Sequence, residues 1–85
     1  MVENKVDLFL LNLIKDNNNI VYKITASDLY KSFKIYCSDN DIKIISNKIF
    51  GVIIKTYKSI FYYRHVKRYY NIIIPNLKQD LIFYN

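Results

Sequence analysis

Hydrophobic and polar positions alternate along the chain in patterns that predict helices first and then a hairpin. Over residues 2–16 apolar side chains recur at the i, i+3, i+4, i+7 and i+8 spacing of one helix face. That face consists of Val6, Phe9, Leu10, Leu13 and Ile14. Leu8 and Leu11 lie off it, so we expect either the chain's own C-terminal tail or a partner outside the domain to cover them.

A β-branched run over residues 20–24 predicts a short strand, and a helix start follows it directly. Thr25 is suited to the N-cap, and Asp28 puts an acid in the first turn, where the helix dipole favours it. The second predicted helix spans residues 26–37 and ends in a polar turn over residues 38–41. Its expected buried face consists of Ala26, Leu29, Tyr30, Phe33, Tyr36 and Cys37.

A third helix is predicted over residues 47–57, with Ser46 as its N-cap. Its expected core face consists of Phe50, Ile53, Ile54 and Tyr57, and its opposite face of Lys48, Gly51, Val52 and Lys55. A glycine in mid-helix costs about 1 kcal/mol relative to alanine. Gly51 therefore indicates that another group comes close to the backbone of this helix. We expect that group to be the second helix on the inside rather than a phosphate backbone on the outside.

Residues 59–74 predict a hairpin with aromatic cross-strand pairs. The expected pairs are Ile60 with Ile72 and Tyr62 with Tyr70 on one face, and Phe61 with Asn71 and Tyr63 with Tyr69 on the other. The tip, residues 64–68, lacks the glycine of a tight two-residue turn, which predicts a longer loop. Pro75 is expected to end the second strand. The pattern predicts an α+β fold, a small winged helix-turn-helix of three helices and a C-terminal hairpin wing.

Composition adds a strongly uneven charge to this picture. The 85 residues are 52% hydrophobic, enough for one small core, and the net charge is +6. Residues 42–79 hold eight cationic side chains and no acid, whereas residues 1–41 are close to neutral. The excess of positive charge in the second half of the chain favours a polyanion as the partner. The single Cys excludes an internal disulfide, and no apolar run is long enough to predict a membrane span.

In a helix-turn-helix the second helix lies in the major groove, with its N-terminal residues nearest the base edges. A wing beside it lies along the duplex backbone or in the minor groove. We therefore predict a domain that binds duplex or forked DNA. The candidate nucleic-acid-binding residues are Ser46, Asn47, Lys48, Lys55, Lys58, Arg64, His65, Lys67 and Arg68. Asn47 is the candidate for a base edge, and the other contacts are mainly to phosphates, which position without specifying sequence. Stacking of single-stranded bases on the hairpin tyrosines is an alternative.

Several of these residues also support a resemblance to a known family. The segments Ala26–Tyr30, Phe33–Lys34, Tyr36–Cys37, Ser46–Asn47 and Phe50–Gly51, followed by a hairpin, resemble the C-terminal winged-helix domain of poxvirus-type primase–helicases, which is also found in phage and plasmid primases. The resemblance covers residues 20–74. It implies a longer parent, a hexameric nucleoside triphosphatase that uses ATP and magnesium in viral DNA replication in the host cytoplasm. Residues 1–19 would then connect to a preceding domain, and residues 75–85 would form an apolar tail.

No cluster of residues suggests catalysis by this part of the chain. A glycine-rich phosphate loop, a carboxylate pair and a set of metal ligands are all missing, so we expect a binding domain with no catalytic residue, metal or cofactor of its own. We expect the domain alone to be monomeric. The alternative function is protein–protein docking, with a replication partner or a neighbouring helicase domain bound to the apolar side of the first helix and the tail.

Overall fold

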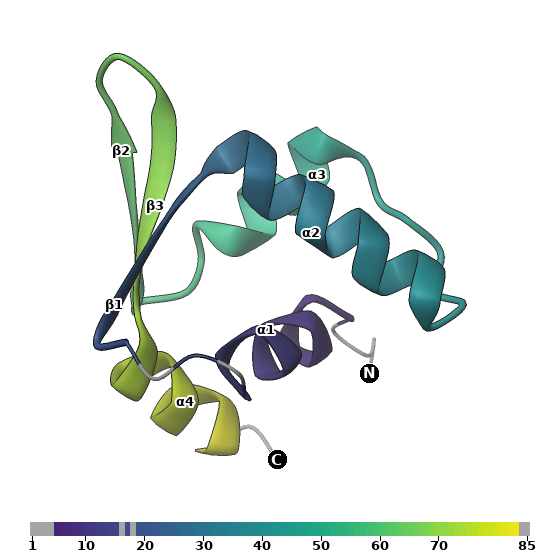
Figure 1. The fold of residues 1–85 in the computed structure, drawn as a ribbon, viewed down its shortest axis with the longest axis horizontal. Helices are drawn as coiled ribbons and strands as arrows, with labels where there is room; N and C mark the ends of the chain where they lie inside the picture. The colour runs from purple at the N-terminus through teal and green to yellow at the C-terminus, as the bar shows by residue number, and fades with distance from the viewer. Residues whose placement is uncertain (1–4, 16, 18, 84–85) are drawn as a thin grey trace.

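The computed structural model describes residues 5–15, 17 and 19–83, which form four helices and one three-stranded sheet (Figure 1). The elements in chain order are α1 (Lys5–Lys15), β1 (Val21–Thr25), α2 (Ala26–Asp39), α3 (Asn47–Ile54), β2 (Ile60–Arg64), β3 (Arg68–Ile73) and α4 (Ile74–Phe83). The α+β class is confirmed, and the order of elements is that of a winged helix-turn-helix. The helix count is corrected from the predicted three to four among the described residues.

Both predicted N-caps are confirmed. The Thr25 hydroxyl accepts a hydrogen bond from the backbone N–H of Asp28, and the Ser46 hydroxyl accepts one from Ile49. Each of them satisfies a backbone donor that the first turn of a helix otherwise leaves free. The sequence thus encodes where α2 and α3 begin.

The end of α2 is set by a left-handed residue. The backbone N–H of Ile42 donates to the carbonyl of Cys37 at 2.8 Å, and Asp41 between them has a φ of 55°. This is the Schellman arrangement, in which a short polar residue can replace the usual glycine. It carries α2 two residues further than the predicted end. The Tyr30 hydroxyl then anchors the loop before α3 by donating to the carbonyl of Ile45 at 2.8 Å.

Helix α3 ends three residues before its predicted boundary. After Ile54 the bonds tighten to i→i+3, with Thr56 donating to Ile53 and Tyr57 to Ile54. The Tyr57 hydroxyl also donates to the carboxylate of Asp7 on α1. Tyr57 therefore ties this connection to α1, although it lies beyond the helix in which it was predicted.

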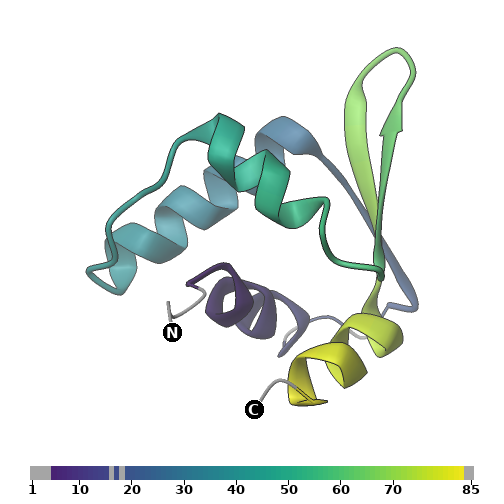
Figure 2. The same ribbon diagram turned by 180° about the vertical axis from the view of Figure 1, so that it is seen from behind.

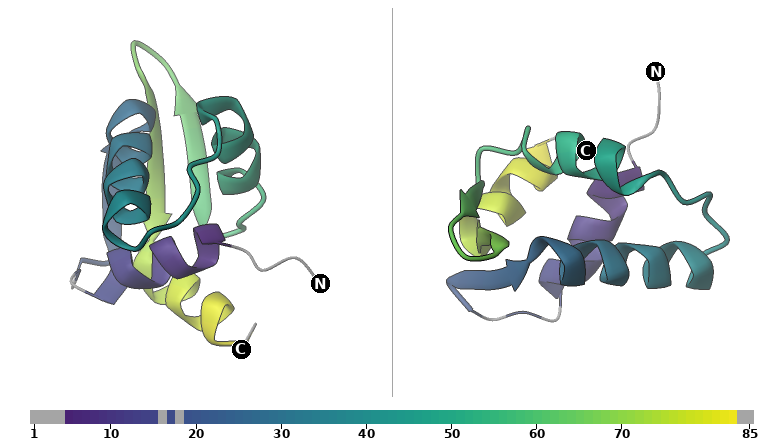
Figure 3. Two further views of the ribbon diagram at one scale, coloured as in Figure 1. Left: turned by 90° about the vertical axis from the view of Figure 1, so that its right-hand side faces the viewer. Right: turned by 90° about the horizontal axis from the view of Figure 1, so that it is seen from above.

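The sheet is antiparallel in the order β1–β3–β2 (Figure 2). All four predicted cross-strand pairs of the hairpin are confirmed, and Arg64 pairs with Arg68 across a three-residue loop. The strand predicted at residues 20–24 lies one residue later and pairs with β3 along its whole length, from Val21 with Ile73 to Thr25 with Tyr69. β3 is therefore the central strand, and the hairpin tip projects beyond α2 and α3 (Figures 1 and 3).

Helix α4 is the element that the sequence analysis missed. Pro75 was taken only as the end of a strand, but proline is also well tolerated in the first turn of a helix, where its missing N–H has no partner to lose. Leu77 and Leu81, four residues apart, are both buried. Helix α4 packs against α1 and β3, so the chain's own C-terminal segment covers part of α1, one of the two expectations for that helix. Of the two residues off its main stripe, Leu11 packs against the core and Leu8 stays 37% exposed.

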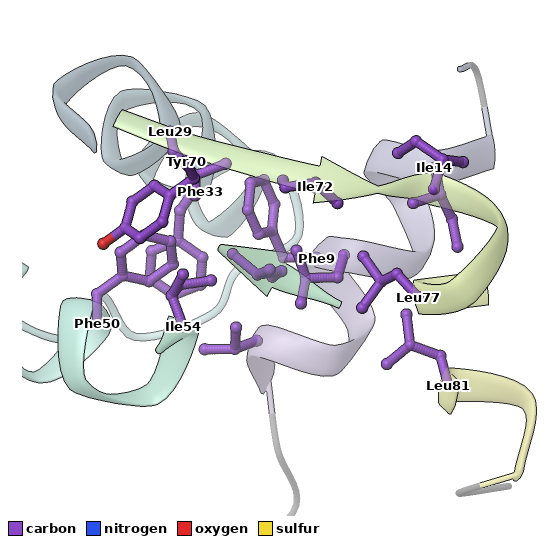
Figure 4. Packing of buried hydrophobic residues seen from close by; sticks show 14 of the residues in the cluster. Phe9, Ile14, Leu29, Phe33, Phe50, Ile54, Tyr70, Ile72, Leu77 and Leu81 are labelled. Atoms are coloured by element: carbon purple, nitrogen blue, oxygen red, sulfur yellow. The ribbon is translucent and has the colours of Figure 1, made fainter. Parts of the chain in front are cut away.

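The hydrophobic core takes residues from all four helices and from the hairpin (Figure 4). At its centre the rings of Phe33 and Phe50 stack with centroids 4.6 Å apart, and Phe9 meets Phe33 edge-on at 5.4 Å. Cys37 is fully buried in this cluster, and its burial raises the pKa of the thiol. Cys37 is therefore a small core residue, as predicted. The core joins α2 to α3 and fixes the angle at which α3 faces the hairpin.

Candidate nucleic-acid interface

A groove of about 1100 Å³ lies between α3, the hairpin and the start of α2. We call it the inner groove. Its walls hold Asn47, Lys48, Gly51 and Val52 from α3 with Lys55 from the C-cap of that helix, Tyr62, Lys67, Arg68 and Tyr70 from the hairpin, and Thr25, Ala26, Ser27 and Asp28 from the start of α2. Five of the nine predicted site residues thus come together in it from two segments of the chain.

The α3 wall follows from the register of that helix. Phe50 and Ile54 are buried, which turns Asn47, Lys48 and Lys55 away from the core and leaves all three exposed. Ser46 is placed differently: its hydroxyl is used as the cap, and the residue does not line the groove. Ser46 therefore positions α3 rather than adding a side chain to the groove surface.

The hairpin wall combines cations with two tyrosines. Lys55 of α3 reaches across the groove, with its Nζ 4.3 Å from the centroid of the Tyr62 ring, a cation–π distance. Tyr62 in turn lies 5.4 Å from Tyr70. Burial raises the pKa of the Tyr70 phenol, with a smaller raising contribution from Tyr62 and a lowering one from Arg68. Tyr70 therefore stays neutral at physiological pH and keeps its hydroxyl proton.

The start of α2 is the part of the groove that sequence reasoning missed. Thr25, Ser27 and Asp28 line it, although they were noted only as helix-capping residues. Asp28 is the single acid among the described lining residues, against Lys48, Lys55, Lys67 and Arg68. The groove therefore keeps a net positive charge.

The expectation for Gly51 was wrong. Apart from its chain neighbours and the backbone of α3 itself, a Cβ built at this position would have one heavy atom of the described residues within 4 Å, the Tyr70 hydroxyl oxygen at 4.0 Å. The second helix makes no close approach there. Gly51 instead leaves bare backbone on the groove wall, the side from which a phosphate backbone would approach in the less favoured alternative.

Lys58, Arg64 and His65 lie outside the inner groove, although each was a predicted site residue. Lys58 belongs to the turn before β2, and Arg64 ends that strand. His65 lines a second groove of about 560 Å³ on the other side of the wing, which we call the outer groove. The outer groove is lined by Lys23, Ile24, Thr25, His65, Val66, Lys67 and Tyr69. Thr25 and Lys67 are shared by the two grooves.

The one acid in the second half of the chain lies elsewhere. Asp80 on α4 accepts a hydrogen bond of 2.7 Å from the Ser59 hydroxyl at the base of the hairpin. It lines neither groove. The positive charge of the wing is therefore not neutralised by an acidic side chain of residues 42–83.

The described residues contain no group of three or more His, Cys, Asp or Glu side chains that would hold a metal ion. None of the helices in this part of the chain has the length and hydrophobicity needed to cross a membrane.

Comparisons of the chain with protein-family models, curated proteins and solved structures found no match. Its function is therefore argued from the fold and from the two grooves.

Proposed function

We propose that this domain binds duplex DNA in the inner groove, mainly through phosphate contacts. The observation that carries the proposal is the convergence of Lys48 and Lys55 from α3 with Lys67 and Arg68 from the wing. Cations from separate elements that line one groove make a surface for a polyanion. The domain acts in this proposal as a binding module and supplies no catalytic group.

The shape of the surface favours B-form duplex over duplex RNA. The exposed face of α3 carries Asn47 and Lys48 in its first turn, beside the protruding wing. The major groove of B-DNA is about 12 Å wide and admits a helix, whereas that of A-form RNA is too narrow for side chains to read. Asn47 is the candidate for a base edge, since its amide can pair with adenine in two hydrogen bonds.

The proposed biological setting rests on the resemblance of residues 20–74 alone. It places the domain at the end of a longer viral primase–helicase, an ATP- and magnesium-dependent hexamer that acts in DNA replication in the host cytoplasm. Other replication proteins are further partners in this setting.

The docking alternative is less well supported by the packing. It relied on the apolar side of α1 and on the tail, but Leu81 is buried in the core and Leu11 packs against it. The side chains of residues 82–85 lie outside the described part of the chain. Leu8 alone leaves little apolar area for a partner on the main part of α1.

A salt titration of duplex binding tests the proposal. With a fluorescein-labelled duplex, we expect the anisotropy-derived affinity to fall steeply with salt, with a log–log slope of about −0.9 for each phosphate contact. Binding whose affinity stays flat across the titration would overturn the proposal.

A pair of matched variants locates the contacts. The double variant Lys48→Ser, Lys55→Ser removes two cations from the inner groove, and Lys58→Ser, Lys78→Ser removes two from outside it. The first variant is expected to reduce the salt slope by about two units, and the second to leave it within error of the wild type. Equal losses in both would mean that net charge, and not the groove, determines binding.

A further inference from the structure

We propose that the outer groove binds an unpaired nucleotide, with its base against the aromatic surface at Tyr69 and its phosphate near Lys23. Tyr69 lies on the opposite hairpin face from Tyr62 and Tyr70, which line the inner groove, so its ring belongs to a different surface, although Thr25 and Lys67 line both grooves. The inference rests on the proposed function only for the source of the strand, which we take to be one strand leaving a bound duplex.

An aromatic surface is the first component of the site. The Tyr69 ring is half-buried in the groove wall and stacks on Tyr63 of β2, with centroids 5.3 Å apart and planes 18° from parallel. Tyr63 is 43% exposed, and Phe61 on the same face is 48% exposed. Alternation along β2 and β3 places all three rings opposite the core face. Exposed rings of this kind are the surface on which single-stranded bases stack, whatever their sequence.

Positive charge around that surface is the second component. Lys23 of β1 places its Nζ 4.5 Å from the centroid of the Tyr69 ring, and Lys67 lines the same groove. No acid is among the described lining residues. A ligand that offers both a flat apolar ring and a negative charge matches this combination. The long flexible side chain of Lys23 can leave the ring for a phosphate when a base stacks there.

Volume and accessibility favour an unpaired base over a paired one. The groove of about 560 Å³ has room for a single nucleotide. A duplex keeps the faces of its bases stacked inside the helix and therefore presents only phosphates to such a site. The aromatic wall would be of no use for duplex binding, so it distinguishes the outer groove from the inner one.

The wing tip connects the two grooves. Val66 is 87% exposed at the apex of the three-residue loop, where the His65 N–H donates to the Lys67 carbonyl at 3.3 Å. Lys67 at the tip lines both grooves, as does Thr25 away from the tip, and Val66 lines the outer one. A strand that separates from a duplex in the inner groove would pass this apolar tip before it reaches Tyr69. A junction between duplex and single strand is therefore the ligand that fills both grooves at once.

The test separates base stacking from charge. Fluorescence anisotropy compares a short labelled oligothymidylate with an abasic oligomer of the same length, which keeps the phosphates and lacks the bases. We expect the thymidylate to bind at least about tenfold more tightly, the effect of one stacked base. Equal affinities would overturn the proposal. Displacement of the thymidylate by polyglutamate as readily as by unlabelled thymidylate would also overturn it, and would mark the groove as a site for an acidic peptide.

Variants place the site. Tyr69→Leu keeps an apolar side chain in the sheet and is expected to abolish the preference for thymidylate over the abasic oligomer. The loop variant His65→Ser, Val66→Ser alters only exposed positions and is expected to reduce thymidylate binding severalfold, so the test stands even if Tyr69→Leu fails to fold. The inner-groove variant Lys48→Ser, Lys55→Ser is the control, and should retain the preference. Unchanged thymidylate affinity in the loop variant would overturn the proposed location, and so would an unchanged preference in a folded Tyr69→Leu protein.

Failure here and failure of the proposed function give different results. If the domain binds duplex with steep salt dependence but shows no preference for bases over abasic sites, only the outer-groove inference is lost. If thymidylate binds with base preference while duplex is ignored, the proposed duplex function is lost and the outer groove remains.

Discussion

The two faces of the β2–β3 hairpin have nearly the same composition and opposite surroundings. On one face Ile60, Tyr70 and Ile72 are buried in the core, and Tyr62 packs against it. On the other, Phe61 and Tyr63 are exposed and Tyr69 and Asn71 are only half-buried. Both faces carry large apolar residues. The difference shows that composition alone does not tell which aromatic residues stabilise the fold and which remain available to a ligand.

The packing around the hairpin makes the distinction. Helices α2 and α3 cover one face, and β1 extends the sheet at the β3 edge without covering the other (Figures 1 and 3). The Oδ1 atom of Asn71, on the uncovered face, is buried without a hydrogen-bond partner among the described residues. An unsatisfied polar atom of this kind is costly in a finished core. The packing of the helices against one face only is therefore what separates the two sets of aromatic residues.

The largest expected effect comes from truncating the covered face. Ile72→Ala is expected to lower the free energy of unfolding by about 2–5 kcal/mol, because Ile72 is fully buried and its loss leaves a cavity. Ile73→Ala is the matched control, since Ile73 is the next residue of β3 and lies half-buried on the other face. Urea denaturation monitored by circular dichroism measures both. Similar losses would contradict the assignment of the two faces.

Sequence reasoning predicted the hairpin well because its information is local. The pairing of Tyr62 with Tyr70 follows from the two-residue period and from a loop that is short in sequence, and it is confirmed. The caps at Thr25 and Ser46 are equally local, since each depends on a side chain three residues before the bonded N–H. Local signals of this kind need no knowledge of the tertiary fold.

The missing parts of the candidate site depend on contacts that are distant in sequence. Lys23 meets Tyr69 only because β1 pairs with β3, a pairing that nothing in residues 20–24 specifies. Asp28 and Ser27 reach the inner groove for a similar reason, since the start of α2 lies against the hairpin. Helix α4 was missed for a different reason, since its signal is local. The four-residue spacing of Leu77 and Leu81 is visible in the sequence, but Pro75 was interpreted only as the end of a strand and not as part of the first turn of a helix.

A smaller effect is expected at Gly51, where the inner groove and the fold make opposite demands. Gly51→Ala should raise the free energy of unfolding by about 1 kcal/mol, because alanine is the better helix residue and its Cβ would meet only the Tyr70 hydroxyl at 4.0 Å. We expect duplex affinity to fall at the same time, because the added methyl group stands on the groove wall. Thermal denaturation and duplex anisotropy on one protein sample measure the two effects. Higher stability with unchanged affinity would mean that the DNA backbone does not approach α3 at this turn.

The smallest expected effect concerns the one acid of the inner groove. Asp28→Asn should raise duplex affinity by about threefold, because an exposed like charge beside bound phosphates costs about half a kcal/mol or somewhat more. It should also lower stability by about 0.3–1 kcal/mol, because Asp28 lies in the first turn of α2, where the dipole favours an acid. Asp39→Asn changes net charge equally at the opposite end of α2, outside both grooves, and should leave duplex affinity almost unchanged. Equal gains in both variants would assign the effect to overall charge. A gain in affinity confined to Asp28→Asn would show that the Asp28 carboxylate has two opposite effects. It stabilises the first turn of α2, and it weakens the binding of nucleic acid in the inner groove.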